Sequence, residues 1–342
     1  MRENERGGNM KLLLTPIQAG ALELKNRLAY PPIATAKAEA DGSVSQQMLD
    51  YYSEKTAGGY LSLVIIEHSF VTMQGKASRN QLSVADNSAV AGLARLAEVI
   101  HKNGSKTVMQ INHAGSMAEQ EITGMEPVGP SAIAPMRKKS AAIPRELTAG
   151  EIQNIVSAFA DAARRVKAAG FDGVELHSAH GYLLNQFFSP LSNRRTDAYG
   201  GTVHNRIRLH MEVIEAVRGA VGKDFPLLMR LGATDDAPGG TSIEDSVAAA
   251  KALEQAGVNL LDISGGLCGS ALSGDSGQGY FGPFSKAIKE NVSIPVLLTG
   301  GVTKAQAAEE LLKAGKADLI GIGRAIFTDS GWLKRELREM RG

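Results

Sequence analysis

The sequence has little of what several classes of protein require. It contains one cysteine, Cys268, among its 342 residues, which excludes an intramolecular disulfide framework and a multi-cysteine metal site. A single cysteine fits a reducing compartment. The formal net charge is +1 and no dense run of Lys and Arg occurs, so no nucleic-acid partner is expected.

Long apolar stretches are also missing. No apolar run is long enough to span a bilayer, and the N-terminal stretch MRENERGGNM lacks the apolar core of a secretory signal. We therefore expect a soluble, cytoplasmic protein with no membrane partner. Residues 1–10 are predicted to form a disordered or tag-like tail ahead of a single domain over residues 11–342.

What the chain does contain is a regular alternation of short β-branched segments and amphipathic helical segments. The predicted strands are 28–32, 61–67, 107–112, 173–177, 226–231, 260–264, 295–298 and 318–322. The predicted helices that follow them are 46–57, 88–102, 151–169, 203–221, 244–255, 283–291, 304–314 and 331–340. Eight alternations favour an α/β chain folded as one (β/α)8 TIM barrel. An open doubly wound sheet would carry a Gly-rich turn after its first strand, where YPPIATA has no glycine.

Two connections in this pattern are long. One follows the third strand, from His113 to about Gly150, and the other follows the sixth strand, from Ser264 to Gly282. In a barrel both lie at the C-terminal face, which carries the chemistry of this fold. Since long loops in compact domains are usually functional or mobile, we interpret them as lids over a site rather than plain surface insertions.

The last two predicted strands end in glycine turns, TGG with Gly300 and Gly301, and GIGR with Gly323 and Arg324. Glycine lets backbone N–H groups approach an anion closely, and a helix N-terminus follows each turn. The guanidinium of Arg324 adds a fork that matches phosphate. Two such turns with an arginine therefore predict a phosphate site, where one alone would indicate only a tight turn.

Three polar side chains, Gln110, Glu175 and Arg230, interrupt predicted strands that should be apolar. A charge inside a barrel is costly unless it is paired. Glu175 and Arg230 therefore either neutralise each other as a structural pair, or Glu175 contacts a ligand directly. For Arg230 and Gln110, which lie near the rim, we favour contacts with a polar heterocycle.

The stretch VELHSAHGYLLNQF brings His177, His180 and Tyr182 to the end of the fourth predicted strand. Imidazole can polarise a carbonyl oxygen, and a phenol can deliver a proton to a developing carbanion. Together they suit reduction of a double bond conjugated to a carbonyl. A metal site is disfavoured, since the chain has neither HExxH nor a cysteine cluster. A structural role, or an acid–base pair of an aldolase or isomerase, stays open at this point.

The motifs HSAHGYLLNQFFSPLSNRRTDAYGGTVHNRIRL, QINHAG, GPSAI and ADLIGIGR together resemble the Old Yellow Enzyme family of FMN-dependent ene-reductases. The resemblance covers nearly the whole chain. It implies a (β/α)8 barrel that holds FMN at its C-terminal face. It also implies that NADH or NADPH reduces the flavin, which then passes hydride to the β-carbon of an activated alkene.

The same resemblance implies roles for individual residues. His177 and His180 match the pair that holds the carbonyl oxygen of the substrate, and Tyr182 matches the proton donor. No metal ligand is implied. The residues implied to bind the cofactor are Pro31, Pro32, Ile33, Ala34, His68, Gln110, Arg230, Gly300, Gly301, Gly323 and Arg324.

The sequence also departs from the family pattern. Many members carry Thr or Cys where Ala34 stands, and Ala36 stands where one subgroup has a tyrosine. PPIAT is more similar to the branch with enoate and dienoyl-CoA reductases, whose larger members contain an iron–sulfur cluster. One cysteine cannot supply four thiolates, so we expect no such cluster and direct hydride transfer from NAD(P)H. The identity of the unsaturated small-molecule substrate, homo-oligomerisation and a separate electron-donor partner are left open.

Two other functions compete with that of an FMN ene-reductase. One is a flavin-free TIM-barrel lyase or isomerase for a phosphorylated substrate, and the other is a sensor that holds FMN without turnover. A lysine at the end of the sixth strand would support the lyase, but LLDISGG contains none.

Overall fold

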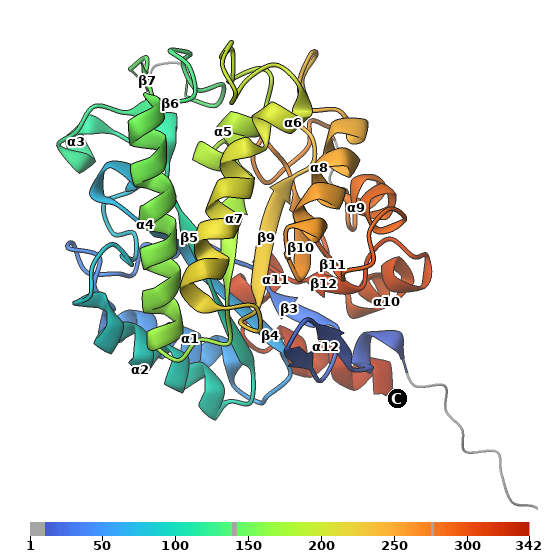
Figure 1. Ribbon diagram of the computed structural model, residues 1–342. Coiled ribbons are helices and arrows are strands. Elements are labelled where there is room, and N and C mark those ends of the chain that lie inside the picture. Colours follow the sequence, from blue (N-terminus) through green and yellow to red (C-terminus); the bar gives the residue numbers. More distant parts are fainter. Residues whose placement is uncertain (1–10, 139–141, 275–276, 342) are drawn as a thin grey trace, which may run out of the picture.

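The computed structural model describes residues 11–138, 142–274 and 277–341. In it, eight parallel strands close into a barrel (Figure 1). The strands follow one another around the barrel in chain order: β3 (Leu28–Tyr30), β4 (Leu63–Phe70), β5 (Lys106–Asn112), β8 (Gly173–Ser178), β9 (Leu227–Gly232), β10 (Leu260–Ser264), β11 (Val296–Thr299) and β12 (Leu319–Gly321). The predicted (β/α)8 TIM barrel is confirmed, whereas the predicted tail over residues 1–10 lies outside the described residues.

Helices surround the barrel (Figure 1). The longer ones are α1 (Gln46–Thr56), α2 (Ala89–Lys102), α4 (Ala149–Ala168), α7 (Arg208–Val221), α8 (Ile243–Gln255), α9 (Gly282–Lys289), α10 (Ala305–Lys313) and α12 (Trp332–Arg341). The single helix predicted over 203–221 is wrong in one detail, because α6 (Val203–Arg206) is separated from α7 by Ile207. The sequence patterns also missed three short helices, α3 (Gln120–Thr123), α5 (Leu183–Phe188) and α11 (Arg324–Thr328).

Local sequence signals explain where the main helices begin and end. Thr148 and Glu151 form a capping box at the start of α4, in which each side chain accepts from the backbone N–H of the other residue. Gly170 after α4 and Gly257 after α8 have φ values of +84° and +98°. Only glycine adopts such values without strain, so it ends both helices.

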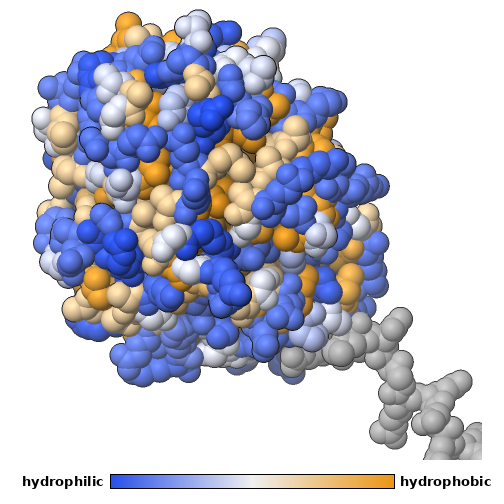
Figure 2. All heavy atoms as spheres, viewed as in Figure 1, coloured by the Kyte–Doolittle hydropathy of each residue, from blue (hydrophilic) through white to orange (hydrophobic). Residues whose placement is uncertain are grey.

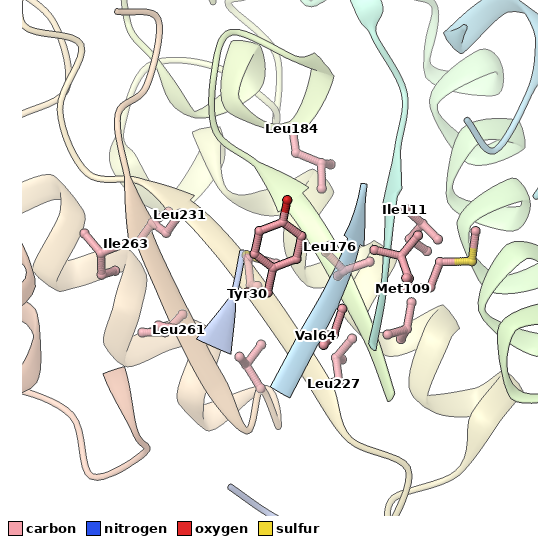
Figure 3. Close-up of a cluster of buried hydrophobic side chains, with 14 of the residues drawn as sticks. Tyr30, Val64, Met109, Ile111, Leu176, Leu184, Leu227, Leu231, Leu261 and Ile263 are labelled. Atoms are coloured by element: carbon pink, nitrogen blue, oxygen red, sulfur yellow. The ribbon is translucent and has the colours of Figure 1, made fainter. Parts of the chain in front are cut away.

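The strands have two apolar faces, because successive side chains point to opposite sides of a strand. Outward-facing residues such as Val64, Met109 and Leu176 belong to the large core between strands and helices (Figure 3). A second cluster fills the lower half of the barrel interior. Its strand residues are Ala29, Leu63, Ile65, Val108, Leu228, Leu260, Leu297 and Leu319.

A hairpin of β1 (Ile17–Ala19) and β2 (Leu22–Leu24) closes the N-terminal end of the barrel. Its buried residues Ala19, Leu22 and Leu24 join the same interior cluster. The lower end is therefore closed by apolar side chains. The polar side chains inside the barrel lie at the C-terminal ends of the strands.

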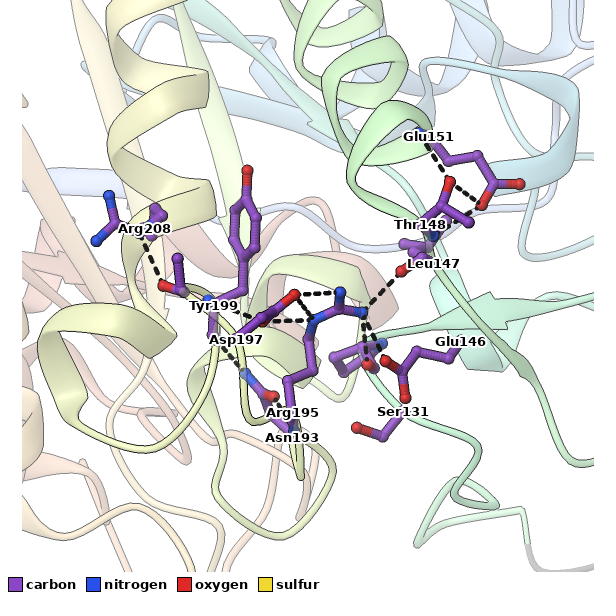
Figure 4. A network of polar contacts seen from close by, with 12 residues as sticks. Ser131, Glu146, Leu147, Thr148, Glu151, Asn193, Arg195, Asp197, Tyr199 and Arg208 are labelled. Atoms are coloured by element: carbon purple, nitrogen blue, oxygen red, sulfur yellow. Dashed lines mark hydrogen bonds and ion pairs between the residues drawn. The ribbon is translucent and has the colours of Figure 1, made fainter.

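The predicted long loop after the third strand has structure of its own. It contains the 3-10 helix η3 (Gly115–Met117), the short helix α3 (Gln120–Thr123), and β6 (Val128–Gly129) paired with β7 (Arg145–Glu146). Figure 4 shows how Arg195, from the segment after β8, holds this loop through hydrogen bonds. Its guanidinium donates to the carbonyl oxygens of Pro130 at 3.1 Å and Leu147 at 2.7 Å, and also to Asp197. The NRRTDAYGG part of the central motif therefore has a structural role.

None of the described helices is both long enough and apolar enough to cross a membrane. On the face shown in Figure 2, hydrophobic residues are interspersed with hydrophilic ones.

Candidate active site

A cavity of about 390 Å³ lies at the C-terminal ends of the barrel strands. Every residue that the sequence predicted as catalytic or cofactor-binding lines it: Pro31, Pro32, Ile33, Ala34, His68, Gln110, His177, His180, Tyr182, Arg230, Gly300, Gly301, Gly323 and Arg324. The fold thus brings together residues from almost the whole length of the chain, although their individual roles stay predictions. The sequence reasoning missed other lining residues, namely Arg137, Ser264, Ser270, Ala271, Tyr280, Thr299, Val302, Thr303 and Gly321.

Four rings gather on one side of this cavity. The centroid of the His177 ring lies 5.1 Å from that of His180 and 5.0 Å from that of Tyr182. His68 stacks on Tyr182 at 5.1 Å. A sharp turn after β8 makes this grouping, because His180 has φ +60° and the next residue, Gly181, has φ +74°. Nε2 of His180 lies 2.8 Å from the hydroxyl of Ser264, which holds the ring.

Burial sets the protonation state of these rings. It lowers the pKa of His177 and of His180 well below the ordinary value, and the positive charge of Arg230 adds to the effect. The pKa of His68 falls to about 4 for the same two reasons. Burial raises the pKa of Tyr182, and the charge of Arg137 opposes the rise. At neutral pH the site therefore offers neutral imidazoles and a protonated phenol.

The tautomer of His68 follows from its neighbour. Its Nδ1 lies 2.8 Å from Nε2 of Gln81, an amide nitrogen that can only donate. In the neutral ring the proton is then on Nε2. His177 differs, because its buried Nδ1 has no hydrogen-bond partner among the described residues. This ring can therefore change its tautomer to suit a ligand.

A layer of polar side chains lies at the floor of the cavity. Its ion pair differs from the Glu175–Arg230 pair that the sequence offered as one interpretation. Arg230 does not form its ion pair with Glu175. Its Nε lies 3.2 Å from Oδ2 of Asp262, while Glu175 accepts a hydrogen bond from Nε2 of Gln110 at 2.7 Å. Asp262 had a signal in the sequence, since it is the one charged residue in the apolar strand LLDIS. In the barrel it lies directly in register with Arg230 on β9.

The backbone is crowded at Gly301 and Gly321, which explains why glycine occurs at these two positions. A Cβ on Gly321 would lie 2.2 Å from Oγ1 of Thr299, and one on Gly301 would lie 2.3 Å from the carbonyl oxygen of Gly277. The start of α10 is occupied, because the N–H of Ala305 donates to Oε2 of Glu336 at 2.9 Å. No side chain caps the start of α11, so the first N–H groups of that helix can face an anion. Arg324 is exposed at the rim and makes no ion pair with a described carboxylate.

This set of groups fits a planar heterocycle with a phosphate tail. The amide of Gln110 and the cation of Arg230 suit the polar edge of a ring, and the glycine turns with Arg324 suit the phosphate. His, Cys, Asp and Glu side chains of the described residues form no cluster of three that could hold a metal ion.

Comparisons with known proteins also point to a flavin-binding family. A family model described as the NADH:flavin oxidoreductase / NADH oxidase family matches residues 12–340. An NADH oxidase of Thermoanaerobacter brockii is 41% identical over 322 residues, which are 92% of this chain and 49% of that protein. An NADPH dehydrogenase of Geobacillus thermodenitrificans is 38% identical over 330 residues, which are 96% of this chain and 94% of that protein.

A solved structure extends the likeness to three dimensions. The old yellow enzyme homologue from Zymomonas mobilis superposes with a TM-score of 0.83 at 27% identity, over 96% of this chain and 93% of that one. Lengths differ among the relatives, since this chain spans about half the length of the NADH oxidase that it matches.

Proposed function

This chain belongs to the NADH:flavin oxidoreductase / NADH oxidase family, and we propose on that premise that it reduces small α,β-unsaturated carbonyl compounds with FMN and NADH or NADPH. The resemblance to the Old Yellow Enzyme family is confirmed, and FMN with a nicotinamide donor is the cofactor set of such proteins. The observation that carries the proposal is the gathering of His177, His180 and Tyr182 at the cavity that also contains the glycine turns. Bound FMN would supply the hydride chemistry between the nicotinamide and the β-carbon of the alkene.

The residues that would hold FMN divide into three groups. Gln110 and Arg230 would contact the polar edge of the ring system, and the positive charge of Arg230 would favour the reduced, more negative form. The segment from Pro31 to Ala34 would lie against the ring. Backbone N–H groups at the two glycine turns, with Arg324, would bind the phosphate.

The substrate side follows from the protonation states. A neutral imidazole has one N–H to donate, so His177 and His180 together can give two hydrogen bonds to one carbonyl oxygen. These bonds strengthen as negative charge builds on that oxygen during hydride arrival at the β-carbon. Tyr182, protonated at neutral pH, then gives its proton to the α-carbon. Hydride and proton together saturate the double bond.

The alternative of a flavin-free lyase or isomerase has less support. No lysine is found among the described residues that line the cavity, and Gln110 and Arg230 would have no ring to contact. An FMN-holding sensor would share the whole site. Sustained NAD(P)H oxidation on addition of an enone would exclude a sensor.

The experiment separates the two half-reactions. The protein loaded with FMN is first reduced anaerobically with NADH or NADPH and then mixed with an enone in a stopped-flow instrument. Tyr182→Phe should slow the second half-reaction about 10²–10⁴-fold, the usual contribution of a general acid, and leave flavin reduction within about twofold. Tyr60→Phe, a matched change remote from the cavity, should alter neither rate. Protein that takes up no FMN, or equal losses in both half-reactions of Tyr182→Phe, would overturn the proposal.

A further inference from the structure

The carboxyl group of Glu175 lies beneath the cavity and does not line it. The side chain projects from β8 and is fully buried, and Gln110, its neighbour in register on β5, separates it from the cavity. Two residues earlier on the same strands stand Val108 and Gly173, which are apolar or lack a side chain. Stability alone does not explain a carboxyl group at this position, because a buried charged group seldom stabilises a fold more than an apolar one.

The contact between the two side chains is directional. Nε2 of Gln110 donates to Oε2 of Glu175 at 2.7 Å. An amide has a donor end and an acceptor end, so this bond leaves the carbonyl end of Gln110 for the cavity. Oε1 of Glu175 has no hydrogen-bond partner among the described residues. The bond to Gln110 is therefore the polar contact that the structure records for this carboxyl group.

The charges around Glu175 indicate that it adds little to stability. Arg230 is the cation of the layer, and it is already paired with Asp262. Burial raises the pKa of Glu175 well above its ordinary value, the negative charge of Asp262 raises it further, and Arg230 opposes the rise. The carboxyl group thus lacks a counter-ion of its own.

We propose that Glu175 is a positioning residue, which turns the carbonyl oxygen of Gln110 toward the cavity so that it accepts from a ring N–H of bound FMN. This inference rests on the proposed function. It assigns a task to a residue that sequence reasoning left undecided between a structural pair and a ligand contact. Glu175 touches neither cofactor nor substrate, and it acts only through Gln110.

The test is a double-mutant cycle read by FMN affinity and by the midpoint potential of bound FMN. Glu175→Met has nearly the same volume and no acceptor, and Gln110→Met removes the amide. Each single change should raise the Kd for FMN about tenfold, as expected for one hydrogen bond, and should shift the potential. The double variant should match Gln110→Met in both readouts, because the first change acts through the second residue.

A structural role predicts different results. If Glu175 only supported the fold, Glu175→Met would lower the free energy of unfolding of the FMN-free protein. We expect that value to be unchanged or higher, since an unpaired buried carboxyl group is removed. Should Glu175→Met fail to fold, Glu175→Gln replaces it. The new amide can present either end to Gln110, so the Kd should rise about threefold, again only when Gln110 is present.

Two kinds of failure can be told apart. Wild-type protein that binds no FMN overturns the proposed function, and this inference with it. Wild-type protein that binds FMN, combined with additive losses in the double variant or an unchanged Kd in Glu175→Met, overturns this inference alone.

Discussion

The lower and upper halves of the barrel interior are built on the same strands and have opposite chemistry. The lower layer includes Val108, Leu228, Leu260 and Leu297. Two residues further along the same strands stand Gln110, Arg230, Asp262 and Thr299. Residues i and i+2 of a strand face the same side, about 6.6 Å apart. The interior therefore changes from apolar to polar within one side-chain repeat.

The contrast teaches that stability and function come from different halves of one barrel. The lower half is closed by the β1–β2 hairpin and is filled by apolar side chains. In the upper half, buried polar atoms of the cavity lining, such as Nδ1 of His177, have no hydrogen-bond partner among the described residues. Such atoms cost stability unless a ligand satisfies them, which is the usual signature of a binding site.

Acid should lower the free energy of unfolding through the histidines of the upper half, and we expect this effect to be the largest. Five histidines lie at or beside the upper ends of the strands. His113, His177 and His210 are buried, and His68 and His180 are half-buried in the cavity wall. Burial lowers their pKa values, to about 4 for His68 and His113 and about 3 for His210. The unfolded chain takes up these protons near pH ~6.5 and the folded chain does not, so stability falls as pH drops below about 6.5.

Each such ring contributes about 1.4 kcal/mol per pH unit. Glu175 and Asp262 offset part of the loss, because their raised pKa values favour the folded state at low pH. A net loss on the order of 5–10 kcal/mol is expected between about pH 6.5 and 4.5. Urea unfolding at several pH values measures it. A free energy of unfolding that stays constant over this range would contradict the neutral-imidazole site.

Removal of the cation of the upper layer should give the next largest effect. Arg230→Met leaves Asp262 buried without its counter-charge, which should lower the free energy of unfolding by about 3–5 kcal/mol. Arg230→Lys retains the charge and is the matched control, with an expected loss of less than half as much. Equal losses in the two variants would mean that packing, rather than charge, explains this residue.

Two changes on β11 compare the halves directly and should give the smallest effects. Leu297→Ala in the lower layer should cost about 2–4 kcal/mol of stability and leave FMN affinity within about twofold, since Leu297 does not line the cavity. Thr299→Val removes the hydroxyl that donates to Asp262 at 3.0 Å. It should cost about 1–2 kcal/mol and also weaken FMN binding. Weaker FMN binding in Leu297→Ala would show that the two halves are coupled.

The sequence predicted much of the site because its signals are local. The barrel follows from eight alternations, and the glycine turns and the His-x-x-His-x-Tyr spacing can be recognised within short stretches. Asp262 was not predicted, because one carboxylate in the apolar strand LLDIS does not by itself indicate its partner on another strand. Arg137 was missed for a physical reason: it reaches the cavity from a long loop, where its guanidinium lies 3.5 Å from the carbonyl oxygen of His180. No local pattern places such a side chain.

The amino-acid sequence by itself determined the order of strands and helices, the alternation of inner and outer faces, and the residue types available at the upper rim. These depend on periodicity and on backbone preferences, which act over a few residues. Only the tertiary structure decided which polar groups pair, namely Arg230 with Asp262 and Gln110 with Glu175. Such pairing depends on the register and curvature of a closed barrel, and these exist only once all eight strands have come together.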